Sequence, residues 1–397
     1  MTAPPTPVAA LAAALLGPSA LVGAYRLTLL AAAAAPARPP QLAGDPHTRF
    51  VVVVPAHDEE AGLAPTVAAV LGQEYPGPLR RVVVVADNCT DSTADVARAA
   101  GAEVLERADP QRRGKGHALA WALPQVLPGA DAVVLLDADC LPAADLLVRF
   151  DARLRSGARI VQADYRVANP AASQQAALRY AGFALENTVR SAGRSRLGAS
   201  SGLLGTGMAF ARDVLERHPW DAFSFAEDRE YHLRLVAAGE RVAFAGETHV
   251  RSDMPVTAAA AHSQEQRWES GRASQLRHST PALLRAAARD RAPAALDAAM
   301  EPLLPPQALW AAMNAAALLA AAATGRRHAV ALALAAGFAA QGVFITGGLA
   351  AAGAPPAVWR ALATGGPSFV ARRVRRIAAQ ATGHGPTTWV RTARDAA

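Results

Sequence analysis

Two aspartates, Asp137 and Asp139, have the type and spacing for chemistry on a phosphorylated ligand. They follow the apolar run 133–136, which predicts a buried strand. Ligands of open α/β sheets bind at the carboxyl ends of the strands. Two carboxylates one residue apart at such an end can hold a hard divalent cation beside a diphosphate. Solvated aspartates also end ordinary strands, so the interpretation depends on what else lines the same edge.

Polar residues follow two other predicted strands at this edge. The strand 50–54 ends in Pro55-Ala56-His57-Asp58-Glu59-Glu60, and the strand 81–86 ends in Asp87-Asn88-Cys89. A carboxylate after the second strand can accept hydrogen bonds from a base or a ribose. At least one of the acids 58–60 is expected instead to complement the dipole of the next helix, and Asp91 to cap the helix after that.

Lys115 is the only lysine of the chain and lies in Arg113-Gly114-Lys115-Gly116. Flanking glycines let the backbone approach a ligand closely, and an ammonium group is a good point-charge partner for phosphate. The Walker spacing of a P-loop is absent. A coding bias explains the excess of arginine, and the lysine that remains indicates a site where a compact ammonium is needed.

Two later segments complete the set of candidate site residues. Glu227 and Asp228 begin a predicted helix, where a carboxylate can act as general base toward an acceptor hydroxyl or simply complement the helix dipole. Gln264, Arg267 and Trp268 share one helical face. An amide, a guanidinium and an indole there suit a diphosphate and a sugar, although an interfacial helix with an aromatic anchor has the same pattern.

Alternating strands and helices predict an α/β fold with a mainly parallel sheet covered on both faces. The predicted strands are 50–54, 81–86, 103–106 and 132–136, and the predicted helices are 63–73, 92–100 and 116–123. After Asp139 the pattern loosens, as expected for an acceptor-binding half. The predicted organisation is a membrane anchor and linker (1–48), a catalytic domain (49–256), interfacial helices (257–303), a membrane hairpin (304–352) and a basic cytoplasmic tail (353–397).

Three apolar stretches, 8–35, 308–323 and 329–352, approach the length that a membrane-spanning helix needs. The arginine-rich segment 372–376 is expected to stay in the cytoplasm. An even number of crossings between it and the catalytic region places that region in the cytoplasm too. Arg326 and Arg327 at the outer turn count against a full crossing, and a hairpin that enters one leaflet gives the same orientation.

The chain of 397 residues is 52% hydrophobic and carries a formal net charge of +7. Its basic residues concentrate near the apolar stretches, which indicates anionic lipid rather than nucleic acid as the partner. Two cysteines, Cys89 and Cys140, give no disulfide framework and fit a reducing compartment.

Taken in order, Asp87, Asp137-Ala138-Asp139, Glu227-Asp228 and Gln264-x-x-Arg267-Trp268 resemble the family 2 glycosyltransferases, which have the GT-A fold. The similarity covers about residues 49–275 and is greatest to the membrane-integrated branch: cellulose, chitin, hyaluronan and poly-N-acetylglucosamine synthases and ceramide glucosyltransferase. Three departures are visible. Ala226 replaces a threonine common in the synthases, Asn88 and Cys89 replace a small pair, and about three membrane segments are few for a translocation channel.

The resemblance implies a role for each matching position. Asp87 would contact uracil, Pro55, Ala56 and Glu59 would line the nucleotide pocket, and Lys115 would reach the nucleotide. Asp137 would face uridine diphosphate, Asp139 would bind Mg²⁺ or Mn²⁺, and Gly205-Thr206-Gly207 would lie at the acceptor. Asp228, beside Glu227, would be the base of an inverting displacement, and Gln264, Arg267 and Trp268 would hold the diphosphate and the acceptor end.

The implied function is a membrane-bound transfer of a sugar from a UDP-sugar to a glycan or a lipid. Polymer synthesis and single transfer to a lipid both remain open, as does assembly into an oligomer. A dolichyl-phosphate-type transferase fits Gln264-x-x-Arg267-Trp268 less well. A nucleotidyltransferase would not explain that motif together with Asp228, and a non-catalytic GT-A scaffold subunit would require a lost base or metal ligand.

Overall fold

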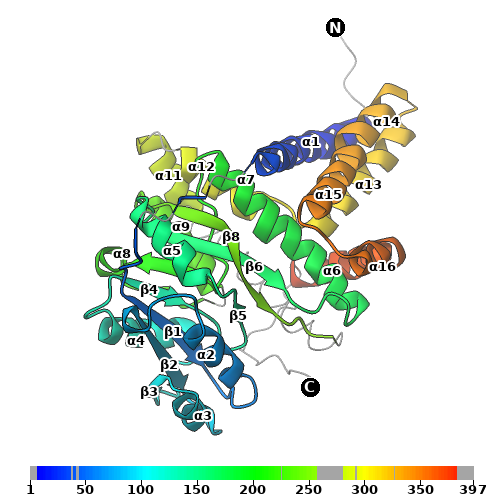
Figure 1. The fold of residues 1–397 in the computed structure, drawn as a ribbon. Helices are drawn as coiled ribbons and strands as arrows, with labels where there is room; N and C mark the ends of the chain where they lie inside the picture. The colour runs from blue at the N-terminus through cyan, green and yellow to red at the C-terminus, as the bar shows by residue number, and fades with distance from the viewer. Residues whose placement is uncertain are drawn as a thin grey trace.

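The computed structural model describes residues 7–36, 39–41, 44–224, 226–256, 280–290, 293–325 and 327–381. An eight-stranded sheet lies on one side of the molecule, and a group of long helices lies on the other (Figure 1). The strand order in the sheet is β3-β2-β1-β4-β7-β6-β8-β5. Strands β1 to β4 come first along the chain and form one half of the sheet, and the later strands form the other half.

The first half of the sheet is parallel, as the sequence predicted. It contains β1 (Phe50–Ala56), β2 (Arg80–Asp87), β3 (Glu103–Arg107) and β4 (Ala132–Leu135), connected through η1 (Gly77–Leu79) and the helices α2 (Leu63–Leu71), α3 (Thr93–Ala99) and α4 (Lys115–Val126). Val52 and Val54 belong to one apolar cluster and Val51 and Val53 to another. Alternate side chains of a strand point to opposite faces, so both faces of this sheet are covered.

The second half of the sheet is mixed. It contains β5 (Leu141–Pro142), β6 (Ile160–Val167), β7 (Met208–Ala211) and β8 (Val242–Ser252), with α5 (Leu146–Arg155), α8 (Arg212–Arg217) and α9 (Glu227–Ala237). Strand β7 pairs antiparallel with both β4 and β6, and β6 pairs parallel with β8. The change of direction at β4 opens a crevice at its carboxyl end, directly before Asp137.

The remaining described helices lie mostly in a second layer beside the sheet. They are α1 (Pro7–Ala34), α6 (Gln174–Phe183), η2 (Ala184–Val189), α7 (Arg190–Arg196), α11 (Thr280–Asp290), α12 (Pro293–Met300), η3 (Glu301–Leu303), α13 (Gln307–Ala323), α14 (Arg327–Ala333), η4 (Leu334–Ala339), α15 (Ala340–Ala351) and α16 (Pro356–Ala381). Helices α6 and α7 join the two layers, because α16 packs on α6 and α1 packs on α7 (Figure 1). Sequence analysis did not predict α16, which fills much of the segment assigned to a basic tail.

Within the part of the chain that the structure describes, two helices are long and apolar enough to cross a membrane, namely Ala10–Ala34 and Arg327–Ala351. The remaining predicted stretch, 308–323, belongs to a bent pair of helical segments, Pro293–Leu303 and Gln307–Ala323, whose axes differ by 72°. The pair is either a broken span or a re-entrant segment. Helices α11 and α12 pack their apolar residues against Leu233 and Val236 of α9, which places them on the catalytic layer.

Candidate active site

Lys115 is held between two loops. One carries Asp137-Ala138-Asp139 and is called the D-x-D loop below, and the other lies between α7 and β7 and carries Gly205. Its ammonium donates to Asp137 Oδ1 at 2.5 Å and to the Gly205 carbonyl at 2.6 Å, and lies 3.8 Å from Glu227 Oε1. Burial by itself would lower the pKa of Lys115, but the charges of Asp137, Glu227 and Asp228 outweigh it and raise that pKa. The lysine therefore stays charged and links three segments far apart in the sequence.

The glycines beside Lys115 are required by the backbone and by packing. Gly114 has φ +110°, in the region that favours glycine. A Cβ on Gly116 would lie 2.2 Å from the Ala222 carbonyl oxygen, so α4 can approach the loop before α9 only at a glycine. His117, one residue on, stacks on Phe223 with ring centroids 4.5 Å apart. These contacts fix the start of α4, and with it Lys115, against the loop that carries Glu227 and Asp228.

Asp137, Asp139 and Cys140 offer ligand atoms that all lie within 4.8 Å of one another. Burial raises the pKa of the Cys140 thiol well above its ordinary value, and the two aspartates raise it further. A protonated thiol is a poor ligand for a hard cation, so the two carboxylates are the candidate metal ligands. The Asp137 amide donates to Thr206 Oγ1 at 3.0 Å, which holds the loop against β7.

Glu227 and Asp228 are the first two residues of α9 and line the same cavity as Asp137. Burial raises the pKa of Glu227 to about 7, with Lys115 opposing the shift and Asp228 adding to it. Burial also raises the pKa of Asp228, and Arg229 and Lys115 oppose that shift. Four carboxylates thus gather near one ammonium, an excess of negative charge that suits a divalent cation.

Asp87 is placed at the edge that the sequence predicted, but its carboxylate already has partners. Arg107 Nη1 and Asn88 Nδ2 both donate to Asp87 Oδ1, at 2.5 and 2.9 Å, and Arg107 also contacts Asp109 at 3.0 Å. Sequence analysis missed Arg107, whose place at the end of β3 was the available signal. Asp87 lines the cavity, so the pair can present one fixed acceptor group to a base or ribose.

Pro55, Ala56 and Glu59, which were predicted to line the nucleotide pocket, also line the cavity. Their neighbours have a different role. Asp58 accepts a hydrogen bond from the Thr90 amide at 2.6 Å, and Glu60 accepts one from the Ser92 amide at 3.0 Å. These two acids tie the loop after β1 to the loop after β2, a structural role other than the helix-dipole role expected for at least one of the acids 58–60.

The residue that begins α3 differs from the prediction. Ser92, not Asp91, is the N-cap of α3. Asp91 accepts from the Thr93 amide at 2.9 Å, a local turn that competes with capping. Gln264, Arg267 and Trp268 lie outside the described residues.

The site residues open into one large cavity of about 1900 Å³. One end is lined by Asp87, Lys115, Asp137, Asp139, Glu227 and Asp228. The ideal Cβ position of Gly205 lies 3.4 Å from Asp228 Oδ2 and 3.8 Å from Lys115 Nζ, so both groups face the same small volume. A general base beside a cluster that suits a cation and a diphosphate is the arrangement needed for group transfer to a hydroxyl.

A family model described as "Glycosyltransferase like family 2" matches residues 46–271, which is more than half of the chain. The chain belongs to the family 2 glycosyltransferases. Its fold is GT-A, as the sequence resemblance predicted. The match spans the sheet and both acidic motifs, so it includes the carboxylates at the sheet edge of this cavity.

Two curated proteins are similar in sequence to this family 2 glycosyltransferase. It is 26% identical over 231 residues to a probable glycosyltransferase, YdaM, of Bacillus subtilis, covering 55% of this chain and 54% of that protein. It is 29% identical over 249 residues to the beta-monoglucosyldiacylglycerol synthase of Synechocystis, covering 59% and 50%. The chain thus spans about half the length of these curated relatives.

A solved structure extends the similarity beyond the catalytic layer. The mannosyltransferase PcManGT from Pyrobaculum calidifontis, in complex with GDP-Man and Mn²⁺, is 25% identical with a TM-score of 0.55. The alignment covers 87% of this chain and 96% of that one. Because it reaches beyond residues 46–271, the similarity includes part of the helical layer as well as the GT-A sheet.

Proposed function

We propose that this protein is a membrane-bound, inverting glycosyltransferase that moves a sugar from a UDP-sugar to a hydroxyl of a glycan or a lipid. One observation carries the proposal: Asp228 and Lys115 face the same volume beside Gly205, next to Asp137 and Asp139. A base and a diphosphate site are therefore adjacent within one cavity. The similar mannosyltransferase, solved in complex with GDP-Man, supports a sugar-nucleotide donor.

Asp228 acts as the base in this mechanism. It takes the proton of the acceptor hydroxyl as that oxygen attacks the anomeric carbon. The bond from that carbon to the diphosphate breaks on the opposite face, so an α-linked donor gives a β-linked product. Lys115 holds Asp137 in place and keeps Glu227 oriented.

Asp139, with Asp137, would hold Mg²⁺ or Mn²⁺. The two carboxylates and the excess negative charge around Lys115 fit such a cation, and the similar mannosyltransferase contains Mn²⁺. The metal would stabilise the charge that develops on the leaving diphosphate. Asp87, with Pro55, Ala56 and Glu59, would contact the nucleotide, and Gln264, Arg267 and Trp268 would hold the diphosphate and the acceptor end.

The two apolar helices support a multi-pass membrane protein, and the arginine-rich segment 372–376 supports a cytoplasmic catalytic domain. The test is a transfer assay with labelled UDP-glucose, UDP-galactose, UDP-N-acetylglucosamine and GDP-mannose, each with Mn²⁺ and with EDTA. We expect metal-dependent transfer from a UDP-sugar. Transfer from GDP-mannose alone would correct the donor, and no transfer from any donor would contradict the proposed activity.

A further inference from the structure

The cavity is too large for a sugar nucleotide alone. Its volume of about 1900 Å³ exceeds the roughly 300–1,000 Å³ of ordinary ligand pockets. It extends from the carboxylates at the sheet edge past η2 to α13, α15 and α16. A second ligand therefore has room beside the donor, on the side where the candidate membrane helices lie.

The far part of the cavity, which we call the apolar arm, is lined by hydrocarbon side chains. They come from α6, η2, η4, α15 and α16: Leu178, Leu185, Phe338, Phe344, Ile345 and Phe369. Phe338, Phe344 and Ile345 belong to the candidate span Arg327–Ala351. An apolar arm that opens among such helices suits a hydrocarbon chain and offers a sugar polymer few hydrogen bonds.

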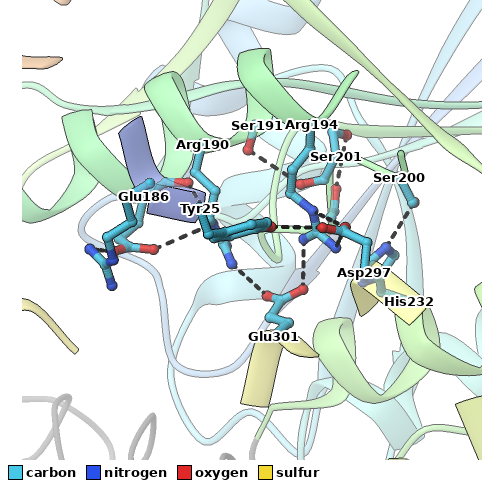
Figure 2. A network of polar contacts seen from close by, with 12 residues as sticks. Tyr25, Glu186, Arg190, Ser191, Arg194, Ser200, Ser201, His232, Asp297 and Glu301 are labelled. Atoms are coloured by element: carbon cyan, nitrogen blue, oxygen red, sulfur yellow. Dashed lines mark hydrogen bonds and ion pairs between the residues drawn. The ribbon is translucent and has the colours of Figure 1, made fainter. Parts of the chain in front are cut away.

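An ionic collar separates this arm from the carboxylates at the sheet edge. It consists of Arg26, Glu186, Arg190 and Glu301, which all line the cavity. Arg26 lies 3.3 Å from Glu186, Arg190 lies 3.3 Å from Glu186 and 2.9 Å from Glu301, and Figure 2 shows Glu186, Arg190 and Glu301 together. Both guanidinium groups of the collar are already paired with carboxylates, which favours a neutral polar ligand over a phosphate.

The collar has neighbours both beside the base and in the arm. On one side, Arg229, the neighbour of Asp228, is close enough to Glu301 for its charge to act on that carboxylate. On the other side, the Arg26 guanidinium lies 5.3 Å from the ring centroid of Phe344, which belongs to the arm. Arg26 is only 5% exposed, and its Nε has no hydrogen-bond partner among the described residues.

We propose that the acceptor is a neutral membrane lipid with a hydroxyl-bearing head, whose chain fills the apolar arm while its head passes the collar to Asp228. This inference rests on the proposed function and chooses between its two acceptor classes. The lipid oxygen forms the new bond to the anomeric carbon, its proton goes to Asp228, and the nucleoside diphosphate leaves. A hydroxyl-bearing head can hydrogen-bond to the collar groups and hydrocarbon cannot, so the head is the part of the lipid that lies toward the base.

Two glycines leave the space that the chain would take. Gly182 of α6 and Gly342 of α15 line the cavity, and an added Cβ at either would meet no atom within 4 Å. Neither has a positive φ. Helix interiors disfavour glycine by about 1 kcal/mol relative to alanine. Gly342 is an exposed position that borders the cavity, so we expect a large side chain there to extend into the arm.

The experiment uses the full chain in phosphatidylcholine vesicles that contain dioleoylglycerol, with the labelled donors and Mn²⁺ of the transfer assay. The variants are Gly342→Phe and a matched control, Val343→Phe, whose side chain lies on the same helix, 54% exposed. We expect the labelled product to be extracted into butanol, as a lipid would be. Gly342→Phe should lower kcat/KM at least tenfold, and Val343→Phe should change it less than twofold. Calorimetric nucleotide binding shows that Gly342→Phe is folded.

A diacylglycerol carrying a photoreactive diazirine in its chain tests occupancy without a donor. We expect it to label peptides of α6, α15 and α16, less so in Gly342→Phe than in Val343→Phe. Labelled product that stays in the aqueous phase, or equal crosslinking in both variants, would overturn the lipid acceptor. Absence of product from every donor would instead overturn the transferase activity on which the inference rests.

Discussion

Lys115 Nζ lies 2.5 Å from Asp137 Oδ1 and forms the contact that joins α4 to the D-x-D loop. The same ammonium reaches the Gly205 carbonyl and faces Glu227. Two carboxylates and one backbone carbonyl, from three separate segments, therefore surround one compact cation. A planar guanidinium cannot occupy this position in the same geometry.

Lys115→Arg is expected to lower kcat/KM for the donor at least tenfold, about 1.4 kcal/mol of transition-state stabilisation. The reason is the loss of the short contact to Asp137, which positions the diphosphate end. Steady-state kinetics with a UDP-sugar measure it. Arg112→Lys, an exchange in the opposite direction at an exposed position three residues earlier, is the control. Unchanged kinetics in Lys115→Arg would show that the site does not need a lysine, and its presence would then have no functional reason.

Asp228→Asn is expected to reduce transfer by about 10²–10⁴-fold, the usual contribution of a general base. Nucleotide binding should persist, because the amide keeps the shape of the side chain. Glu230→Gln is the matched control, since Glu230 lies in the same first turn but bonds to the Ser224 amide and Arg234. Equal losses in the two variants would contradict the assignment of the base.

His232 is expected to make stability depend on pH. Burial lowers its pKa from 6.5 to about 4; Glu301 opposes that shift, and the nearby arginines add to it. Between these values the unfolded chain binds a proton that the folded protein does not, so stability falls as pH falls from 6.5 toward 4. The full effect is up to about 3 kcal/mol.

Thermal unfolding of the detergent-solubilised protein at several pH values measures this dependence. His232→Gln retains a partner for Ser200 Oγ, which lies 2.9 Å from His232 Nε2. It should flatten the pH dependence of Tm in this range, while the exposed His47→Gln should leave it as in the wild type. A profile that keeps its slope in His232→Gln would show that other groups cause it.

Glu301→Gln is expected to destabilise the fold by about 3–5 kcal/mol, because it leaves buried guanidinium charge uncompensated. Arg194 is 1% exposed at its side chain and contacts Glu301 at 2.8 Å, within the network of Figure 2. The control is Glu216→Gln, which breaks an exposed pair with Arg212 and should cost at most about 1 kcal/mol. Similar Tm changes in the two variants would refute a structural role for the buried network.

Local sequence patterns determined the nucleotide half of this protein. Runs of valine between turn residues fix β1, β2 and β4 as buried parallel strands, and parallel strands bring their carboxyl ends to one edge. For that reason Asp87, Asp137 and Asp139 could be placed together from the sequence. Asp228 was a candidate base because it begins a predicted helix, and the family resemblance assigned it to this site, since its distance along the chain carries no geometric information.

Tertiary structure decided which acidic groups are available and what the cavity joins. Asp58 and Glu60 are adjacent to Glu59 in the sequence, yet backbone amides of the next loop occupy them. Arg107 reaches the site from a segment with no visible motif. The collar and the apolar arm combine residues from α1, η2, α7, η3 and α15, which meet only through packing. Charge pairing and burial depend on neighbours in space, so no local pattern could predict them.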